Sequence, residues 1–224
     1  MGEAAGETLS RVARKRGRRI QQILAVAAEL FGEHGYDAVN LDDVAERLDV
    51  TKGSLYYYFA SKDELAAAAI ETLGTDWTDR LERLPAAAEG GPAERLRALI
   101  REHVAIAVRE YPAALRLFLA PSTWPDALRS RITELRRRHD GVFRAVLTEG
   151  IASGEFDVVA LGPTLQAMHA AMSQAPLWCS GLAEPEQERA LDELTATLMK
   201  LVSPRRGPRR EKEPDHDRGR SVEE

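Results

Sequence analysis

The stretch Lys52–Ala60, KGSLYYYFA, places three consecutive tyrosines near the front of a chain of 224 residues. Leu55 and Phe59 stand four residues apart, so they lie on one face of a helix and are expected to point inward. The outward positions are then held by Lys52, Ser54, Tyr57 and Tyr58, with Gly53 letting the backbone approach a surface and Tyr56 at the boundary. For Tyr56, a half-buried aromatic seam between helices is an equally good interpretation.

The residues before this stretch predict two more helices. Apolar residues recur at three- and four-residue steps over residues 18–34, and Gly35 follows where a helix would end. Asn40, with Asp43 three positions on, can cap a short second helix. Thr51 can cap the helix of the opening stretch after a three-residue turn. This layout is a helix-turn-helix, in which the second helix of the pair enters the major groove of DNA.

The outward side chains have the chemistry that DNA requires. Hydroxyls bind bases or phosphates, aromatic rings pack on thymine methyl groups, and lysine pairs with phosphate. Ser61 and Glu64 fit a capping box that opens a fourth helix. Lys62 falls in its first turn, where a cation opposes the helix dipole unless an anion such as a phosphate lies nearby.

Charge is distributed unevenly along the chain. The net charge is −5, yet six basic residues lie between Arg11 and Arg19, and no acid occurs from Thr8 to Ala28. We expect residues 1–17 to form a flexible basic arm that can follow phosphates. Residues 204–224 mix basic and acidic residues without aromatics, which predicts a disordered tail. Contacts from this tail to DNA are less favoured than simple solvation.

The motifs AAELFGEHGYDAV, LDDVAERL and TKGSLYYYFASKDEL together resemble the DNA-binding domain of the TetR family of bacterial transcriptional regulators. The resemblance implies that the third helix reads the major groove and that Tyr58 and Lys62 hold phosphates. Tyr36 and Asn40 would support the backbone from the side. The implied groove contacts are Thr51, Lys52, Gly53, Ser54, Tyr56 and Tyr57.

Two positions depart from the family pattern. Leu48-Asp49 stands where relatives usually carry Ala-Gly, so Asp49 is expected to adopt the left-handed backbone conformation, which aspartate tolerates. Asn40 stands where relatives usually carry threonine. Asparagine caps a helix equally well, which leaves only its phosphate contact in question.

The rest of the chain predicts helices interrupted by proline and glycine, so the fold class is all-α. A three-helix helix-turn-helix domain (18–64) is expected to precede a helical bundle (65–203). By the resemblance, this bundle binds a small-molecule effector and pairs with a second subunit through its last two helices. Small residues on one helix and a leucine stripe on the next suit such a homodimer, although a core within one chain would give the same pattern: Ala167, Ala170, Ala171, Ala175, Leu191, Leu194, Leu198 and Leu201.

Large and adaptable side chains at helix ends are candidates for an effector pocket. For most of them, ordinary core packing is the commoner role, and His139 is expected to be either a core histidine or a hydrogen-bonding group in the pocket. The layout of this domain resembles regulators that sense acyl-CoA thioesters or other lipid catabolites. The candidates are Trp77, His103, Phe118, Trp124, His139, Phe143, Met168, Met172 and Trp178.

Several other classes of protein are not indicated. Cys179 is the only cysteine, which excludes an internal disulfide and a cysteine-rich zinc site. The sequence lacks the HExxH, GxSxG and P-loop patterns, so we expect neither an enzyme nor a metal or cofactor. No window approaches eighteen apolar residues, so we expect a cytoplasmic protein with no membrane contact. The resemblance implies that it is bacterial.

The sequence therefore predicts a dimeric, ligand-responsive regulator that binds double-stranded DNA. The resemblance implies repression, with a small apolar effector releasing the protein from a pseudo-palindromic operator by shifting the fourth helix. The alternative is a helical protein that binds small molecules or partners and carries a vestigial DNA-binding domain.

Overall fold

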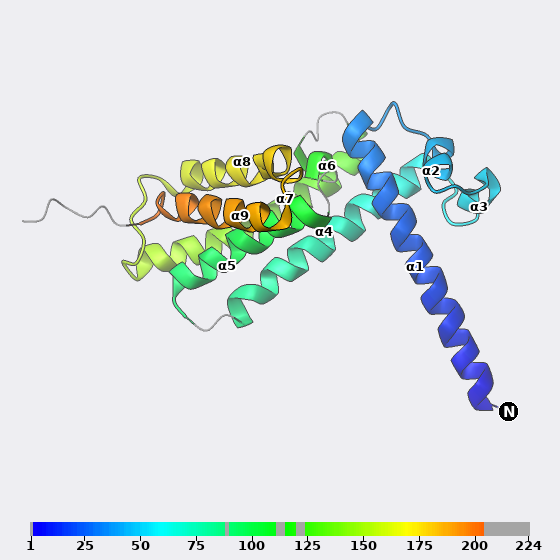
Figure 1. The fold of residues 1–224 in the computed structure, drawn as a ribbon, viewed down its shortest axis with the longest axis horizontal. Helices are drawn as coiled ribbons and strands as arrows, with labels where there is room; N and C mark the ends of the chain where they lie inside the picture. Colours follow the sequence, from blue (N-terminus) through cyan, green and yellow to red (C-terminus); the bar gives the residue numbers. More distant parts are fainter. Residues whose placement is uncertain (1, 88–89, 111–114, 120–123, 204–224) are drawn as a thin grey trace, which may run out of the picture.

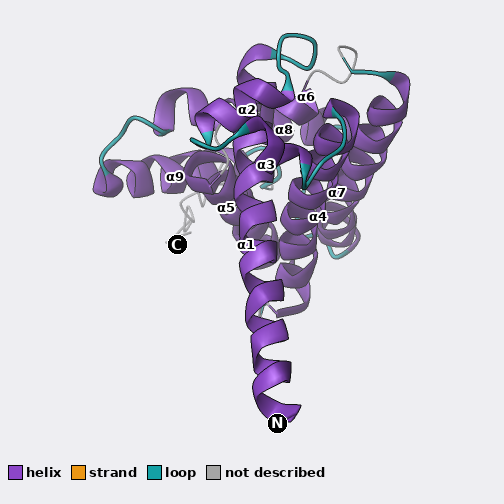
Figure 2. Cartoon of the chain, turned by 90° about the vertical axis from the view of Figure 1, so that its right-hand side faces the viewer, coloured by secondary structure: helices purple, strands orange, loops and turns teal. Residues whose placement is uncertain are grey.

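The computed structural model describes residues 2–87, 90–110, 115–119 and 124–203 (Figure 1). These residues form helices and no strands, which confirms the predicted all-α fold, and Figure 2 shows the same helices from the side. The tail at 204–224 and most of the proline corner at 121–125 lie outside the described residues. The helices are α1 (Gly2–His34), α2 (Leu41–Arg47), α3 (Lys52–Tyr56), α4 (Lys62–Ala87), α5 (Pro92–Ala105), the π-helix η1 (Ile106–Glu110), α6 (Leu115–Leu119), α7 (Asp126–Ala152), α8 (Leu161–Cys179) and α9 (Glu184–Met199).

Local hydrogen bonds set the helix boundaries of the first domain. The Asn40 side chain accepts hydrogen bonds from the N–H groups of Asp42 (2.7 Å) and Asp43 (3.1 Å), while the Asp43 carboxylate accepts one from the Asn40 N–H (2.7 Å). Thr51 Oγ1 accepts from the Ser54 N–H at 3.3 Å. Asp49 has a φ of 50°. Both predicted caps and the left-handed turn residue are therefore present.

The fourth helix begins nearly as expected. Ser61 Oγ accepts a hydrogen bond from the Glu64 N–H at 3.1 Å. The Glu64 carboxylate accepts from the N–H of Ala60 at 2.8 Å, one residue earlier than a standard capping box requires. From this start, α4 runs through both domains and packs against α1 at one end and α7 along its length.

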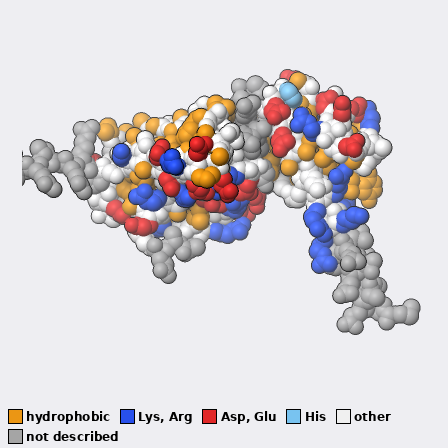
Figure 3. Space-filling model, in the orientation of Figure 1, with side chains coloured by type: hydrophobic (Ala, Val, Ile, Leu, Met, Phe, Trp, Pro, Cys, Tyr) orange, Lys and Arg blue, Asp and Glu red, His pale blue; other side chains and the backbone are white. Residues whose placement is uncertain are grey.

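The expected flexible arm at residues 1–17 is instead helical. Helix α1 begins at Gly2 and extends beyond the rest of the molecule, and Figure 3 shows blue Lys and Arg side chains gathered along it. The physical reason is composition. This segment contains no proline, its arginines, lysine and alanines favour helix, and Gly17 is tolerated at modest cost.

Two hydrophobic cores organise the chain. The first core is formed by residues of the four helices α1, α2, α3 and α4. It also includes Leu117 of α6 and Leu128 and Ile132 of α7, so the DNA-binding domain shares its core with the bundle. The second lies among α4, α5, α7, α8 and α9. Leu191 and Leu198 are buried in this second core, so most of the predicted leucine stripe packs within one chain, while Leu201 is exposed.

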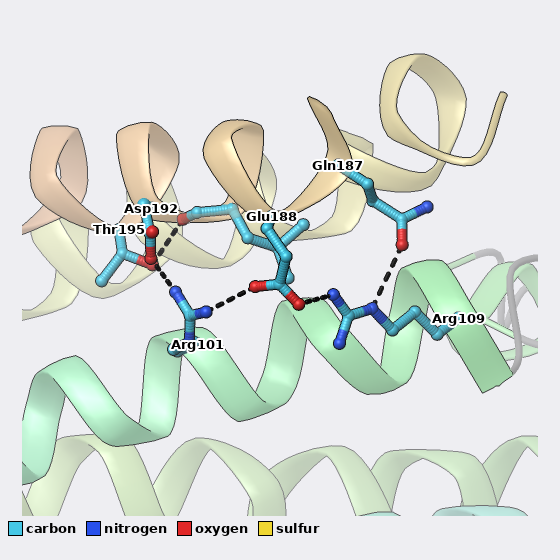
Figure 4. A network of polar contacts seen from close by, with 7 residues as sticks. Arg101, Arg109, Gln187, Glu188, Asp192 and Thr195 are labelled. Carbon is cyan, nitrogen blue, oxygen red and sulfur yellow. Dashed lines mark hydrogen bonds and ion pairs between the residues drawn. The ribbon is translucent and has the colours of Figure 1, made fainter. Parts of the chain in front are cut away.

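Helix α9 is also tied to α5 and η1 by the polar network in Figure 4. Glu188 accepts hydrogen bonds from Arg101 at 2.5 Å and from Arg109. Arg101 also pairs with Asp192, and Arg109 Nε donates to Gln187 at 3.1 Å. These contacts fix α9 along the bundle. Among the described helices, none is long and apolar enough to cross a bilayer.

Candidate DNA interface and effector site

Helix α3 presents the predicted outward face. Leu55 is buried at 1% exposure and Phe59 at 6%, whereas Tyr57 is 72% exposed and Tyr56 is 45% exposed. Thr51, Lys52, Gly53 and Ser54 are exposed as well. Tyr56 therefore lies on the open side of the helix, and not in a buried seam.

Tyr58 and Lys52 are already engaged by neighbours within the domain. Tyr58 is half-buried against the first core, and its ring meets that of Tyr57 edge to face with centroids 5.1 Å apart. Lys52 Nζ lies 2.5 Å from the Asp42 carboxylate, which raises the pKa of the lysine. Because this ion pair is exposed, a phosphate can replace Asp42 as the partner at little cost.

Tyr36 and Lys62 form an internal contact. The buried Tyr36 hydroxyl donates to the Asp63 carboxylate, and burial together with that carboxylate raises the pKa of Tyr36 to about 12. Lys62 Nζ donates to the backbone carbonyls of Tyr36 (2.9 Å) and Asp37 (3.4 Å) and lies 4.2 Å from the centre of the Tyr36 ring. Lys62 therefore holds the loop between α1 and α2, and its predicted contact with phosphate stays a prediction.

Trp124, which the sequence placed in an effector pocket, lies in the core of the DNA-binding domain and lines no cavity described in this structure. It packs in the first core, with its ring centroid 5.3 Å from that of Tyr36 and 5.8 Å from that of Phe31. Trp124 lies just before α7, and this position places its ring in the same core as Phe31 of α1. Trp124 thus joins the DNA-binding domain to the bundle.

A cavity of about 720 Å³ opens among α4, α5, α6, α7 and α8, within the size range of small-molecule sites. Of the residues predicted for an effector pocket, four line this cavity: Trp77, His103, Phe118 and His139. Its wall is apolar on the side of α4 and α6 and polar along α7 and α8. The other lining residues are Gly74, Thr78, Leu115, Leu119, Thr133, Leu135, Arg136, Arg137, Asp140, Arg144, Gln166, His169, Ala170, Ser173 and Gln174.

Four other predicted pocket residues lie elsewhere or behind this wall. Phe143, Met168 and Met172 are fully buried in the second core, which is the commoner role for such residues at helical spacing. Trp178 is 48% exposed near the carboxyl end of α8. Its neighbour Cys179 takes the inward position on that turn, so the indole is left on the surface.

Sequence reasoning missed the polar face of α8. Residues 166, 169, 170, 173 and 174 recur at three- and four-residue steps and all line the cavity. Met168 and Met172 on the adjacent face are buried. A polar stripe beside an apolar stripe on the same helix was therefore the sequence pattern that could have identified these cavity residues. It brings His169 to the site.

Three histidines from three helices meet at the cavity. His103 Nδ1 of α5 lies 3.0 Å from His139 Nε2 of α7, and the rings of His139 and His169 have centroids 5.2 Å apart. His169 Nδ1 lies 3.8 Å from Asp140 Oδ1. Asp140 in turn accepts hydrogen bonds from Arg144 at 2.9 and 3.0 Å.

The surroundings keep these imidazoles neutral. Burial and then the two neighbouring histidines hold the pKa of His103 well below its usual value. Burial, His169 and Arg136 lower the pKa of His139 to about 3. Burial also lowers the pKa of His169, against the opposing effect of Asp140. In the described parts of the chain, no group of three or more His, Cys, Asp and Glu residues is arranged to hold a metal ion.

A helix-turn-helix whose core is shared with a cavity-bearing bundle defines a ligand-responsive DNA-binding transcriptional regulator. Residues 23–69 match the family described as "Bacterial regulatory proteins, tetR family", and residues 89–202 match "Tetracyclin repressor-like, C-terminal domain". The chain belongs to the TetR family.

Named relatives are consistent with this assignment. The Fatty acid metabolism regulator protein of Bacillus subtilis is 25% identical over 137 residues, which cover 61% of this chain and 70% of that protein. The HTH-type transcriptional repressor KstR2 of Mycobacterium tuberculosis is 30% identical over 155 residues, covering 66% of this chain and 74% of the repressor.

Solved structures share the fold. That of the ketosteroid transcriptional regulator KstR2 aligns with a TM-score of 0.68 and 21% identity, covering 83% of this chain and 95% of that one. The structure of AibR in complex with isovaleryl coenzyme A and operator DNA aligns with a TM-score of 0.66 and 20% identity, covering 81% and 98%.

Proposed function

We propose that this protein is a transcriptional repressor that leaves its operator when a small, largely apolar effector occupies the cavity. One observation carries the proposal: α6 contributes Leu115, Phe118 and Leu119 to the cavity and Leu117 to the core of the DNA-binding domain. An effector that favours one position of α6 therefore acts directly on the packing of α1, which in turn packs against α2 of the helix-turn-helix.

The cavity suits an acyl-CoA thioester or a related lipid catabolite. Trp77, Phe118 and Leu135 offer apolar surface for a hydrocarbon chain, while Arg136 and Arg144 offer cations to an acidic group. Three of the similar proteins support this class of ligand. One is named a fatty acid metabolism regulator, one a ketosteroid transcriptional regulator, and AibR is seen in complex with isovaleryl coenzyme A.

The proposed operator complex contains two copies of the chain. Leu177 is 65% exposed beside Trp178 at the end of α8, and Leu182 is exposed in the following loop. A second copy that packs on α8 and α9 would cover these apolar side chains and hold two α3 helices at a fixed spacing, so the operator is a pseudo-palindrome. The proposed groove contacts are Thr51, Lys52, Gly53, Ser54, Tyr56 and Tyr57; Tyr58 adds a phosphate contact, and Asn40 supports the backbone.

A selection from random and genomic duplexes at one near-physiological salt concentration tests the proposal, with wild type and Tyr57→Ala side by side. Tyr57 is chosen because its side chain is exposed, so its loss does not disturb the core. We expect wild type to enrich an inverted repeat and the variant to lose that preference while retaining nonspecific binding. Dodecanoyl-CoA, added to the wild-type complex, should release it. Failure of wild type to enrich any repeat, with or without dodecanoyl-CoA, would contradict the repressor function.

A further inference from the structure

Three buried side-chain nitrogen atoms on the cavity wall have no hydrogen-bond partner in the described part of the chain. They are Trp77 Nε1, His103 Nε2 and His169 Nε2. Trp77 and His103 are neighbours: both are only 4% exposed, and their ring centroids lie 5.1 Å apart. Since buried polar atoms are nearly always paired in folded proteins, an unpaired couple that lines a cavity points to a group supplied by the ligand.

The two nitrogens differ in what they can accept as a partner. An indole N–H only donates, so Trp77 requires an acceptor atom. A neutral imidazole has one donor and one acceptor, and His103 Nδ1 is already committed to His139 Nε2 at 3.0 Å. If His139 donates in that contact, His103 Nε2 carries a proton and donates to the ligand. If His103 donates, its Nε2 accepts from the ligand.

One atom on the ligand can satisfy both nitrogens. A carbonyl oxygen accepts from Trp77 and from His103, and a hydroxyl accepts from Trp77 while it donates to His103. A hydrocarbon chain at this place leaves both nitrogens unpaired. A carboxylate fits less well here, because burial and the neighbouring histidines keep His103 neutral, whereas the cationic Arg136 lies on the exposed part of the wall.

We propose that the effector is an oxygenated acyl compound, with a keto or hydroxyl oxygen along its chain that binds Trp77 Nε1 and His103 Nε2. This inference rests on the proposed function of the cavity as the effector site. His139 acts as a positioning residue, since the proton that it shares with His103 decides whether His103 donates or accepts. Trp77 and His103 then distinguish oxygenated chains from plain saturated ones.

Binding of matched probes to the full-length protein tests the proposal. The probes are dodecanoic acid and its regioisomeric oxododecanoic and hydroxydodecanoic acids, measured by titration calorimetry. We expect at least one oxygenated regioisomer to bind wild type roughly tenfold more tightly than dodecanoic acid, the effect of about one well-placed hydrogen bond. Equal or weaker binding of every oxygenated probe, or no binding of any probe, would overturn the assignment.

Two variants separate the hydrogen bond from general packing. Trp77→Phe removes the N–H and keeps an aromatic ring, so we expect the preference for the oxygenated probe to fall below about threefold. Trp124→Phe makes the same change in the first core, away from the cavity, and should keep the full preference. Retention of the preference in Trp77→Phe contradicts the proposal, provided that thermal unfolding shows both variants to be folded.

Nitrogen NMR of the histidine rings in wild type provides a second measurement that needs no variant. A bound oxododecanoic acid should leave His103 Nε2 protonated, and this tautomer should be better defined than in the free protein. No change at His103 on saturation with the tightest probe would also contradict the proposal. Failure of this proposal can be told apart from failure of the proposed repressor function, because the duplex selection measures DNA binding in the absence of these probes.

Discussion

Leu117 and Phe118 are neighbours on α6, yet Leu117 is buried in the core of the DNA-binding domain while Phe118 lines the cavity. The phenyl ring also packs partly against that same core. A side chain with contacts on both sides is well placed to transmit occupancy of the cavity to α1, since packed interiors shift between discrete arrangements and do not deform smoothly.

Phe118→Ala should therefore separate effector response from DNA binding. We expect operator affinity in fluorescence anisotropy to stay within about threefold of wild type, while the dodecanoyl-CoA concentration for half-release rises at least about tenfold, through lost contact area. Leu117→Ala is the matched change on the other face of α6. It should lower the free energy of unfolding by about 2–4 kcal/mol, because it removes a buried leucine side chain. An unchanged response to dodecanoyl-CoA in Phe118→Ala would show that α6 does not transmit occupancy of the cavity to the DNA-binding domain.

Gly74 lies where α4 meets α6 and α7. A Cβ at this position would lie 2.7 Å from Leu135 Cδ1 and 3.1 Å from Phe118 Cε1. Gly74→Ala should therefore displace these side chains, reduce dodecanoyl-CoA binding at least about fivefold in calorimetry, and lower the free energy of unfolding by roughly 1–3 kcal/mol.

Gly141→Ala is the control for Gly74→Ala. Gly141 is also helical, and a Cβ there would meet nothing within 4 Å. This change should stabilise the protein by roughly 0.5–1 kcal/mol through helix propensity, with normal ligand binding. Equal behaviour of the two variants would show that the close contact at Gly74 has no consequence.

Two lysines in the first domain should respond differently to the same substitution. Lys62→Met removes the donor to the carbonyls of Tyr36 and Asp37, so we expect a loss of roughly 1–2 kcal/mol in the free energy of unfolding. Lys52→Met breaks only an exposed ion pair and should leave the free energy of unfolding nearly unchanged, while it weakens operator binding. Urea unfolding and anisotropy at fixed salt measure both effects. If Lys62→Met loses DNA affinity at unchanged stability, Lys62 binds phosphate after all.

The buried histidines predict a specific pH dependence of stability. Their pKa values are lowered in the folded protein, so below about pH 6.5 the unfolded chain binds more protons and the free energy of unfolding falls as pH falls. For His139, with a folded pKa of about 3, the loss is about 1.4 kcal/mol between pH 7.5 and pH 5.5. Within the cluster, His139 faces His103 and His169. The other groups that line the cavity around these histidines are Trp77 on α4 and Arg136, Asp140 and Arg144 on α7.

Urea unfolding at pH 7.5 and 5.5 measures this loss in wild type and His103→Leu. We expect the pH-dependent loss to be smaller in the variant, because one buried titrating group is gone. His34→Gln, at an exposed histidine outside the cluster, is the matched control. Identical losses in wild type and His103→Leu would contradict the neutral, buried state of His103.

Much of the DNA-binding domain could be derived from the sequence because its decisive contacts are local. Asn40 and Asp43, or Thr51 and Ser54, cap a helix through atoms three residues apart, so type and spacing suffice to predict them. The spacing of Leu55 and Phe59 likewise determines which side of α3 is buried, and therefore that Tyr57 is exposed.

Spacing along one helix does not say which other helix faces it, and tertiary structure alone decided those relationships. Lys62 binds carbonyls 25 and 26 residues earlier in the chain, and Trp124 packs on α1 and not in the cavity. The meeting of His103, His139 and His169 needs three helices to pack at one height. The sequence by itself thus determined the helices of the DNA-binding domain from residue 18 onward, their caps and the exposed side of α3, because periodicity and capping act within a few residues. Packing between distant helices decided the cavity and its unpaired nitrogens, because these depend on how whole helices fit together.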